Sequence, residues 1–514
     1  MNLHPAHYAK VAPNHPAIVM AGSGRIVSYL QLDQASNRAA QLFRTLGLAS
    51  RDVVAVMIGN CPEFLELYWA TQRSGLFFVP ISTRFVAGEV AHIVSDCKAS
   101  VLIVSHAFAA TAKDLAAMLP AATIRLSIHG AIPDYARFET MAEEQTDHPL
   151  IDVVAGYELM YSSGTTGRPK GILKRCDSEP IDTGTTMFRR TVGLYHWSTE
   201  TTYLSTAPLY HSAPLKFCAS VGCAGGTAII MEKFDTEVAL DCLSRHRISH
   251  SQWVPTMFVR LLRLFAMAKQ RYDGAAHRYA IHAAAPCPPQ IKRDMIEWWG
   301  PILHEYFGGA EGNGFTAIDS IEWLARPGSV GRPISGIPHI IDDDGVELPP
   351  GQPGHIYFDG PSFEYLNDPA KTQASRLLNG WSTIGDVGYV DAAGYLYLTD
   401  RKAFTIISGG VNIYPQEIEN VLVSHPRVVD AAVIGVPNEE FGEEVKAIVQ
   451  PLDWTEAGPD LAQDLIRQCR ISLADYKCPR SIEFHRDLPR QPNGKILKGE
   501  LRDRYWHDRN SRII

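Results

Sequence analysis

The chain has 514 residues, of which 46% are hydrophobic and 20% charged, and its formal net charge is −8. This length exceeds one compact domain, so we expect at least two, with the composition of an ordinary globular protein. The acidic balance, without any block of like charge, argues against a nucleic-acid binder and against a polybasic membrane surface.

Cysteine usage and hydrophobic run length narrow the class of protein further. The nine cysteines are scattered and contain no C-x-x-C pair, which disfavours both a disulfide framework and a zinc site. No apolar run approaches 18 residues, so we expect no membrane-spanning helix. The first residues lack the basic-then-apolar character of a signal peptide, and we expect a cytoplasmic protein.

Residues 28–46 have the pattern of an amphipathic helix. Ser28 and Gln31 have capping-box spacing, apolar residues recur at helical intervals, and Gly47 follows as a stop signal. Each of these signals predicts the same element, so we expect one helix between Ser28 and Gly47.

Strand-like and helix-like segments then alternate. Runs of apolar residues at 52–58, 77–79 and 101–104 predict buried strands. Pro62 suits the first turn of a helix that ends near Gly75. This alternation indicates an α/β layer built on a largely parallel sheet.

Residues 161–171 read Tyr-Ser-Ser-Gly-Thr-Thr-Gly-Arg-Pro-Lys-Gly and lie between two short apolar runs that predict strands. The glycines let the backbone turn tightly and expose its N–H groups, which form an anion-binding concavity. Side-chain donors add to these amides: Ser162, Ser163, Thr165, Thr166 and Lys170. The segment is not a Walker A loop, because Pro169 stands at the second glycine position. It predicts a site for a triphosphate.

Three segments in the middle of the chain give weaker signals. His211, in the run 207–214, is either a packing residue or a substrate contact. Residues 251–265 predict the opening of a helix rich in Leu and Phe, a pattern that is usually part of the core. The small-residue turn 282–286 suits the close approach of a flat ring, although the string alone is a weak signal.

The chain from residue 306 onward supplies three more glycine-containing strings. They are Tyr-Phe-Gly-Gly-Ala-Glu-Gly at 306–312, Gly-Trp-Ser-Thr-Ile-Gly-Asp-Val-Gly at 380–388, and Pro-Arg-Gln-Pro-Asn-Gly-Lys-Ile at 489–496. The Asn-Gly dipeptide predicts a tight exposed turn that presents Lys495 outward. After about residue 400 we expect a small α+β unit, with helices from Pro415 and over 460–473 and strands at 428–434, 445–449 and 481–484.

Taken together, the order and spacing of these strings resemble the adenylate-forming superfamily: acyl-CoA synthetases, luciferases and the adenylation domains of peptide synthetases. The resemblance runs from about residue 20 to 500 and is closest to acyl- and aryl-CoA ligases. It implies a large N-terminal α/β domain with layered β-sheets and helices at 1–400. It also implies a small, mobile α+β C-terminal domain at 401–514.

The resemblance assigns roles to particular residues. Phe307 would stack on adenine, Asp386 and Arg401 would bind ribose, Glu311 would coordinate Mg²⁺, and Lys495 would catalyse adenylation. The implied ATP-binding residues also include Ser162, Ser163, Gly164, Thr165, Thr166, Gly167, Lys170, Ala284 and Gly308. Thr165 and His211 join Glu311 and Lys495 as implied catalytic residues. His211, Trp253 and Gly309 would line the acid pocket, and Gly409 and Gly410 would contact coenzyme A.

The sequence departs from the family pattern at a few of these motifs. Ala310 replaces the usual threonine, Ile384 replaces another threonine, and Ala403 and Phe404 stand at the expected hinge. His211 counts against an amino-acid substrate, because amino-acid-activating relatives usually carry aspartate there. A hinge needs only to absorb a backbone change, which small residues can do.

The resemblance implies an ATP-dependent acid–CoA ligase. It would convert a hydrophobic carboxylic acid to acyl-AMP with release of pyrophosphate, and then transfer the acyl group to coenzyme A. Two alternatives remain open: an adenylating enzyme that serves a carrier protein or oxygen chemistry, and a low-activity nucleotide-binding scaffold. Aryl-propenoic, fatty and steroid side-chain acids all remain candidates, and a homodimer is the default assembly.

Overall fold

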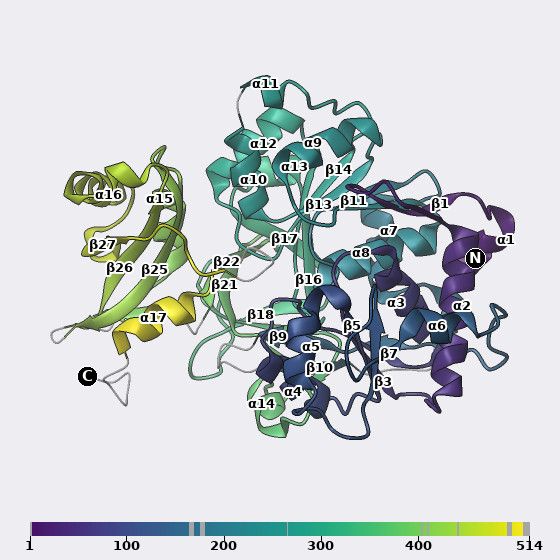
Figure 1. Ribbon diagram of the computed structural model, residues 1–514. Helices are drawn as coiled ribbons and strands as arrows, with labels where there is room; N and C mark the ends of the chain where they lie inside the picture. The colour runs from purple at the N-terminus through teal and green to yellow at the C-terminus, as the bar shows by residue number, and fades with distance from the viewer. Residues whose placement is uncertain are drawn as a thin grey trace.

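The computed structural model describes residues 3–163, 169–174, 180–264, 266–401, 404–408, 411–438, 441–490 and 496–506. Figure 1 shows two unequal lobes, with the smaller one, formed by residues 404–506, at the left of the view. We call residues 3–401 the large lobe and residues 404–506 the C-terminal lobe. Each lobe has its own sheets and its own hydrophobic core.

The first sheet of the large lobe is six-stranded and parallel throughout. In spatial order its strands are β7 (Ala136–Arg137), β6 (Ile124–Ile128), β5 (Val101–Ser105), β3 (Val53–Met57), β4 (Phe77–Pro80) and β8 (Tyr157–Glu158). Every residue of β3 and β5 is buried, as expected for parallel strands covered on both faces. The expected largely parallel α/β layer is confirmed.

Helices of the first 150 residues accompany this sheet. They are α1 (Pro5–Val11), α2 (Tyr29–Thr45), α3 (Pro62–Ser74), α4 (Ala87–Asp96), α5 (Ala109–Leu115) and α6 (Phe138–Glu143). Ser28 and Gln31 form the predicted capping box at the start of α2. Gly75 ends α3 in the left-handed conformation, with φ 72°. Both helix boundaries therefore follow the sequence signals.

The second sheet has thirteen strands and forms the centre of the large lobe. In spatial order they are β18 (Ile337–Ile341), β19 (Gly354–Asp359), β21 (Asp386–Val390), β22 (Leu396–Arg401), β17 (Ser329–Ser335), β16 (Phe315–Asp319), β15 (Leu303–Phe307), β14 (Tyr279–His282), β13 (His250–Trp253), β11 (Thr202–Ser205), β12 (Thr227–Ile230), β1 (Pro16–Met20) and β2 (Ile26–Ser28). The run from β15 to β1 is parallel, and the pairs outside it are antiparallel. The carboxyl ends of β13, β14 and β15 therefore meet at one edge.

Further helices pack against this sheet. They are α7 (Thr186–Tyr195), α8 (Ser212–Ala224), α9 (Thr236–Arg245), α10 (Pro255–Leu262), α11 (Ala266–Lys269), α12 (Pro289–Trp299) and α13 (Ser320–Ala325). In Figure 1, α9, α10, α12 and α13 cluster at the top of the large lobe.

One predicted boundary is wrong. Residues 251–253 belong to β13, and the helix begins only at Pro255. β13 reads His-Ser-Gln-Trp and contains no apolar run, so the sequence pattern does not mark it as a strand separate from the helix. The proline at the first helical position marks the real boundary.

A three-stranded sheet flanks the glycine- and hydroxyl-rich segment. In spatial order its strands are β20 (Phe363–Tyr365), β10 (Pro169–Lys174) and β9 (Met160–Ser163). Helix α14 (Pro369–Ala374) follows β20 in the chain. Strands β9 and β10 pair antiparallel, with Pro169 opposite Ser163. The two predicted strands around the segment are confirmed, and residues 164–168 themselves lie outside the described residues.

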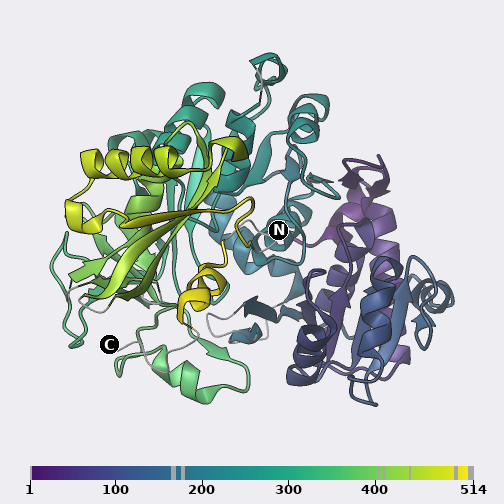
Figure 2. The same ribbon diagram turned by 60° about the vertical axis from the view of Figure 1, so that its left-hand side comes forward.

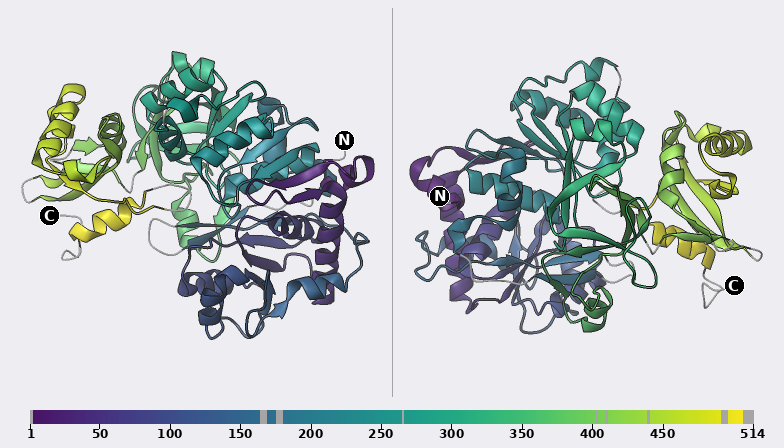
Figure 3. Two further views of the ribbon diagram at one scale, coloured as in Figure 1. Left: turned by 45° about the horizontal axis from the view of Figure 1, so that its top comes forward. Right: turned by 180° about the vertical axis from the view of Figure 1, so that it is seen from behind.

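The C-terminal lobe is a mixed sheet with helices beside it. Its strands are β23 (Ile406–Ser408), β24 (Val411–Ile413), β25 (Val428–Asn438), β26 (Gly442–Pro451) and β27 (Ser481–Phe484), and its helices are α15 (Pro415–Val423), α16 (Pro459–Ser472) and α17 (Lys498–Trp506). Figure 2 brings this lobe to the front, and both views in Figure 3 show it beside the large lobe. The expected α+β unit is confirmed.

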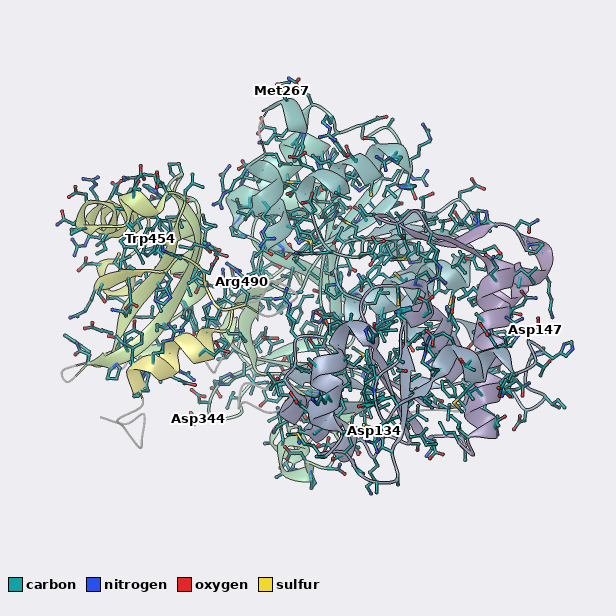
Figure 4. The ribbon with its side chains drawn as sticks, viewed as in Figure 1. Asp134, Asp147, Met267, Asp344, Trp454 and Arg490 are labelled. Atoms are coloured by element: carbon teal, nitrogen blue, oxygen red, sulfur yellow. The ribbon has the colours of Figure 1, made fainter. Side chains whose placement is uncertain are left out.

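Contacts at the start of β25 join the two lobes. Arg263, which follows α10, donates hydrogen bonds to the carbonyl oxygens of Val428 at 2.5 Å and Val429 at 3.1 Å. The neighbouring Asp430 forms an ion pair with Arg490. Figure 4 shows Arg490 on the side of the C-terminal lobe that faces the large lobe. Among the described residues, no helix is long and apolar enough to cross a bilayer.

Candidate active site

A cavity of about 590 Å³ lies in the large lobe. Its wall comes from the ends of β13, β14 and β15, from the start of α8, and from the sheet that flanks residues 164–168. Of the residues proposed from the sequence, six line it: His211, Trp253, Ala284, Gly308, Gly309 and Glu311. Residues far apart in the chain therefore meet at one carboxyl-terminal strand edge, the usual ligand position in an open α/β sheet.

The glycine run after β15 fixes the position of Glu311. A Cβ on Gly309 would lie 2.7 Å from Glu311 Oε2, so a side chain at position 309 would displace the carboxylate from its present position. The Tyr365 hydroxyl donates a hydrogen bond to Glu311 Oε1 at 3.1 Å. The Lys371 ammonium lies 4.3 Å from the Tyr365 ring centroid. The carboxylate is thus oriented by a neighbour on a different sheet.

Tyr306 and Phe307 face opposite ways, as successive residues of a strand must. Tyr306 lines the cavity. Phe307 packs instead toward Phe358, with ring centroids 6.3 Å apart, and is partly buried against the core around Val330 and Leu396. Phe307 is therefore placed beside the cavity, outside its wall.

His211 lies at the N-cap position of α8 and lines the cavity. The side chain of Asn60 holds the preceding segment, accepting from the Leu209 N–H at 2.8 Å and donating to the Ala207 carbonyl at 3.1 Å. Within the described part of the chain, His211 Nε2 is buried without a hydrogen-bond partner. Burial and the nearby Arg84 charge lower the pKa of His211 to about 4, so the ring is neutral at pH 7.

Trp253 serves both of the roles weighed for its segment. Its side chain is 1% exposed and packs against Trp299, with ring centroids 5.2 Å apart. Its indole N–H donates to Ser251 Oγ at 2.6 Å. The residue is nevertheless part of the cavity wall, so it is a core residue at the edge of the site.

Ala284, in the small-residue turn after β14, lines the cavity. Ala284 has φ 77°, a left-handed conformation that is uncommon for a residue with a side chain. Ala310 also lines the cavity, as does Thr383, whose hydroxyl accepts from the Gly385 N–H at 3.0 Å. A hydroxyl-bearing residue is thus present in this wall although position 310 lacks one.

Asp386 and Arg401 are neighbours across two strands. Asp386 begins β21, Arg401 ends β22, and the antiparallel register sets them directly opposite each other. Asp386 is 6% exposed. The pairing brings together the two residues to which the family resemblance assigns ribose binding, and Asp386 lies outside the cavity wall.

Lys170 is engaged within the protein. Its ammonium lies 2.7 Å from Asp368 Oδ2, and Asp368 also caps α14 through the Lys371 N–H. Lys170 and neighbouring amides hold the pKa of the Asp368 carboxyl below its ordinary value. The ion pair links β10, at the end of the glycine-rich segment, to the start of α14.

Comparison with known proteins decides the family. The chain matches the model of the AMP-binding enzyme over residues 6–364 and that of the AMP-binding enzyme C-terminal domain over residues 417–495. The chain belongs to the AMP-binding enzyme family. It is an AMP-forming acid–thiol ligase of the acyl-CoA synthetase type, which activates a carboxylic acid with ATP as an acyl-adenylate.

The curated relatives are similar over almost their whole length. The chain is 31% identical to the fatty acid–[acyl-carrier-protein] ligase ScoC of Streptomyces coeruleorubidus, covering 98% of this chain and 95% of ScoC. It is 32% identical to the long-chain-fatty-acid–CoA ligase FadD13 of Mycobacterium tuberculosis, covering 97% of each. It is also 32% identical to a feruloyl-CoA synthase of an Amycolatopsis species, covering 98% of each.

Solved structures show the same two-lobed fold. ATP-bound MatB from Rhodopseudomonas palustris superposes with a TM-score of 0.83 at 28% identity, covering 98% of this chain and 99% of MatB. Apo MatB gives a TM-score of 0.73 at the same identity, covering 98% of this chain and 99% of MatB. The present structure is therefore more similar to the nucleotide-bound form of that protein.

Several sequence-predicted residues of this AMP-binding enzyme cannot be placed. Gly164, Thr165, Thr166, Gly167, Gly409, Gly410 and Lys495 lie outside the described residues, and the side chains of Ser162, Ser163 and Arg401 are not described. The neighbours of Lys495 are described: Arg490 and Ile496 form a β-bridge, and the Leu497 N–H donates to the Pro489 carbonyl at 2.8 Å.

The cavity of this AMP-binding enzyme also contains residues that the motifs did not indicate. They are Lys174, Arg190 and Lys216, together with Tyr365 and Lys371. Each is contributed by a separate element, and a lone lysine or arginine in a sequence is usually a solvated surface residue. Of these residues, Lys174 is the one that sequence analysis could most readily identify, because it follows the glycine-rich segment by a few positions.

Proposed function

We propose that this enzyme adenylates a hydrophobic carboxylic acid in the 590 Å³ cavity and passes the acyl group to coenzyme A. The observation that carries the proposal is the convergence of Glu311, the Gly308–Gly309 backbone and His211 on one cavity beside the strands that flank residues 164–168. A carboxylate is a poor acyl donor until its oxygen becomes part of a phosphate leaving group. Positioning and charge stabilisation are what the protein must contribute to that phosphoryl chemistry.

The residues present fit a magnesium ion at Glu311. Mg²⁺ is commonly held by one or two carboxylates together with substrate phosphates, and Glu311 presents such a carboxylate, oriented by Tyr365. When bound, the ion would neutralise phosphate charge as pyrophosphate leaves. His211, with a buried and neutral ring, is suited to hold the acid by a hydrogen bond without carrying a permanent charge.

We assign nucleotide and coenzyme A contacts to residues that line or border this site. Ala284 and Phe307 would border the adenine, and Asp386 with Arg401 would bind the ribose. The phosphates would be bound by residues 162–167, with Lys170 next to them in the sequence. Gly409 and Gly410 would contact the pantetheine arm, and Trp253 and Gly309 would bound the acid. The supporting observations are the register of Asp386 with Arg401 and the cavity wall.

We also propose a domain boundary at residues 400–401, with a mobile C-terminal domain that carries the adenylation residue Lys495. The separate core of the C-terminal lobe supports this division. So does Phe404, whose ring lies 5.8 Å from the Lys498 ammonium and therefore packs within that lobe. Arg490, which precedes the segment containing Lys495, lies on the side facing the large lobe (Figure 4). Rotation of the lobe between the two half-reactions can limit turnover.

Coenzyme A is the proposed thiol, and a carrier protein is the second candidate. FadD13 and feruloyl-CoA synthase are named for coenzyme A products, whereas ScoC is named as a carrier-protein ligase at similar identity. Purified enzyme should release pyrophosphate from ATP with members of an acid panel and form acyl-CoA when free coenzyme A is added. Adenylation without any acyl-CoA would favour the carrier protein, and no pyrophosphate release with any acid would refute the proposal.

The Lys495→Ala variant separates the two half-reactions. Loss of the positive charge should reduce acyl-adenylate formation by roughly 10²- to 10³-fold, the cost of removing one preorganised charge-stabilising donor. Conversion of supplied acyl-adenylate to acyl-CoA should stay within about 3-fold of the parent enzyme, well inside the change that 1 kcal/mol would produce. The matched control is Lys477→Ala, which removes a lysine paired with Glu417 elsewhere in the same lobe. An equal loss of both steps would contradict the assigned role.

A further inference from the structure

Three cationic side chains from three different elements line the active-site cavity. Lys174 ends β10, Arg190 lies in α7, and Lys216 lies in α8. Lys216 is only 9% exposed. The Lys174 ammonium lies beside Gly312, where an added Cβ would be 2.9 Å from Nζ. We call these three residues the cationic cluster.

The charges of the cluster act on one another. Burial lowers the pKa of Lys174 well below its ordinary value, and the neighbouring Lys216 and Arg190 charges lower it further, against the opposing effect of Glu158. The Glu158 carboxylate is itself held by a 2.7 Å hydrogen bond from the Tyr68 hydroxyl. Glu158 therefore offsets the charge of Lys174 in part, while Lys216 and Arg190 lie close enough to repel it.

Among the described residues, neither Arg190 nor Lys216 has an anionic partner. Within the described ranges, Lys216 has no salt bridge. Arg190 donates a long hydrogen bond to Ser335 Oγ at 3.4 Å and lies 5.1 Å from the Phe315 ring centroid. A buried cation without a compensating anion is costly, and such groups in a cleft mark functional sites. An anionic ligand group would remove the cost.

Helix geometry separates the backbones of His211 and Lys216. His211 precedes α8 and Lys216 lies five residues further along, a rise of about 7.5 Å at 1.5 Å per residue. Apolar residues line the same cavity, including Met187, Tyr210 and Phe315. A cavity with His211, apolar residues and Lys216 in its wall has contacts for an acid with one carboxylate, an apolar part and a second anionic group.

We propose that the acid substrate carries a second anionic group, a carboxylate, at the end remote from the one that is adenylated. The apolar part between them is a short alkyl chain or an aromatic ring. The inference rests on the proposed function, because it places the acid in this cavity, and it narrows the hydrophobic acid to a dicarboxylate with an apolar middle. The same positive charge could instead serve the phosphates of coenzyme A, an outcome that the experiment separates.

The test compares acids that differ in the second carboxylate alone. Octanedioic acid against octanoic acid, and 4-carboxycinnamic acid against cinnamic acid, are suitable pairs. Pyrophosphate release is followed without coenzyme A, and binding of each acid is measured by calorimetry. In the parent enzyme the kcat/KM of each diacid should exceed that of its monoacid by about 10-fold or more, as expected for a charge-assisted hydrogen bond in a buried site.

Substitution at the cluster should abolish this preference. Lys216→Met and Arg190→Met should each lower the ratio of diacid to monoacid kcat/KM by about 10- to 100-fold. The kcat/KM values for diacid and monoacid are measured on one preparation. Incorrectly folded protein lowers both values equally and does not change their ratio. Lys233→Met, which removes an exposed lysine outside the cavity wall, should keep the parent ratio.

The outcomes separate this inference from the proposed function. Absence of pyrophosphate release with every acid would refute adenylation, while tighter binding of diacids that is lost in Lys216→Met would still support the second carboxylate. Equal affinity of the parent enzyme for both members of each pair would overturn the inference. A rise in the KM for coenzyme A in Lys216→Met, with the diacid ratio unchanged, would also overturn it, because the cluster would then serve the thiol substrate.

Discussion

The carboxylate of Glu311 depends on a tyrosine that no motif in the sequence identifies. Tyr365 comes from β20, 54 positions further along the chain, and its hydroxyl lies 3.1 Å from Glu311 Oε1. Such an outer hydrogen bond fixes the orientation of a metal-binding carboxylate and leaves its charge unchanged. Tyr365 is therefore a positioning residue.

Replacing Tyr365 by phenylalanine should lower the rate of adenylation by about 10-fold and raise the magnesium concentration needed for half-maximal rate, since outer hydrogen-bond partners typically contribute this much. Pyrophosphate release at several magnesium concentrations measures both effects. Tyr357→Phe is the matched control, because Tyr357 lies on β19 and does not line the cavity. An unchanged magnesium dependence in Tyr365→Phe would contradict the positioning role.

At the scale of single residues, the sequence predicts the parts of the site that lie within contiguous strings. His211, Ala284, Gly308, Gly309 and Glu311 meet at the cavity as expected. The cationic cluster was not predictable in the same way, because its members lie on β10, α7 and α8 and only the tertiary fold brings them together. Nor does a motif show that Tyr306, and not Phe307, faces the cavity.

At the scale of single elements, two glycines show how backbone conformation and the space available to a side chain affect stability. Gly75 ends α3 with φ 72°, and a Cβ there would lie 2.9 Å from Ser50 Oγ. Gly88 lies in α4, where an added Cβ would have nothing within 4 Å. The two residues therefore differ in both the conformation and the room available to a side chain.

Gly75→Ala should lower the free energy of unfolding of the large lobe by about 1 to 2 kcal/mol, because alanine is strained in the left-handed region and must displace Ser50. Gly88→Ala should raise it by up to about 1 kcal/mol, because alanine reduces the freedom of the unfolded chain at a compatible helical position. Urea unfolding of the two variants and the parent measures this. Two changes of the same sign would contradict the argument.

Element boundaries follow the sequence where a cap, a proline or a glycine marks them. The capping box at Ser28 and Gln31 and the left-handed Gly75 place α2 and α3 correctly. Residues 251–253 have no such marker before them, and there the prediction extended a helix into a strand. All four residues of β13 are buried, and His250, Ser251 and Gln252 are polar and hydrogen-bonded inside the protein, so no apolar–polar alternation marks the strand.

At the scale of the whole molecule, buried histidines couple stability to pH. Burial lowers the pKa of His250 to about 4, that of His277 to about 3 and that of His304 to about 4. In the unfolded chain these groups titrate near 6.5. Between those values the unfolded state binds protons that the native state does not, so stability is complete above about pH 6.5 and falls as the pH drops toward 4.

The free energy of unfolding should therefore decrease between pH 7 and pH 5, by up to about 2 kcal/mol for each such histidine. Urea unfolding at several pH values measures this. His129 acts in the opposite direction, because Glu63 raises its pKa. His250→Gln should reduce the pH dependence, whereas His148→Gln, at an exposed position, should leave it unchanged. A parent enzyme equally stable at pH 5 and pH 7 would contradict the prediction.

The register of β21 with β22 has a mechanical consequence for the whole enzyme. Asp386 opens β21 opposite Arg401, and the C-terminal lobe begins only three residues later, at Phe404. Under the proposed function, ribose bound at Asp386 would stabilise the last residue pair of β21 and β22, next to the point about which the C-terminal lobe rotates. Nucleotide binding and the rigidity of this hinge would then increase together. A substitution of Asp386 or of Arg401 would change both properties.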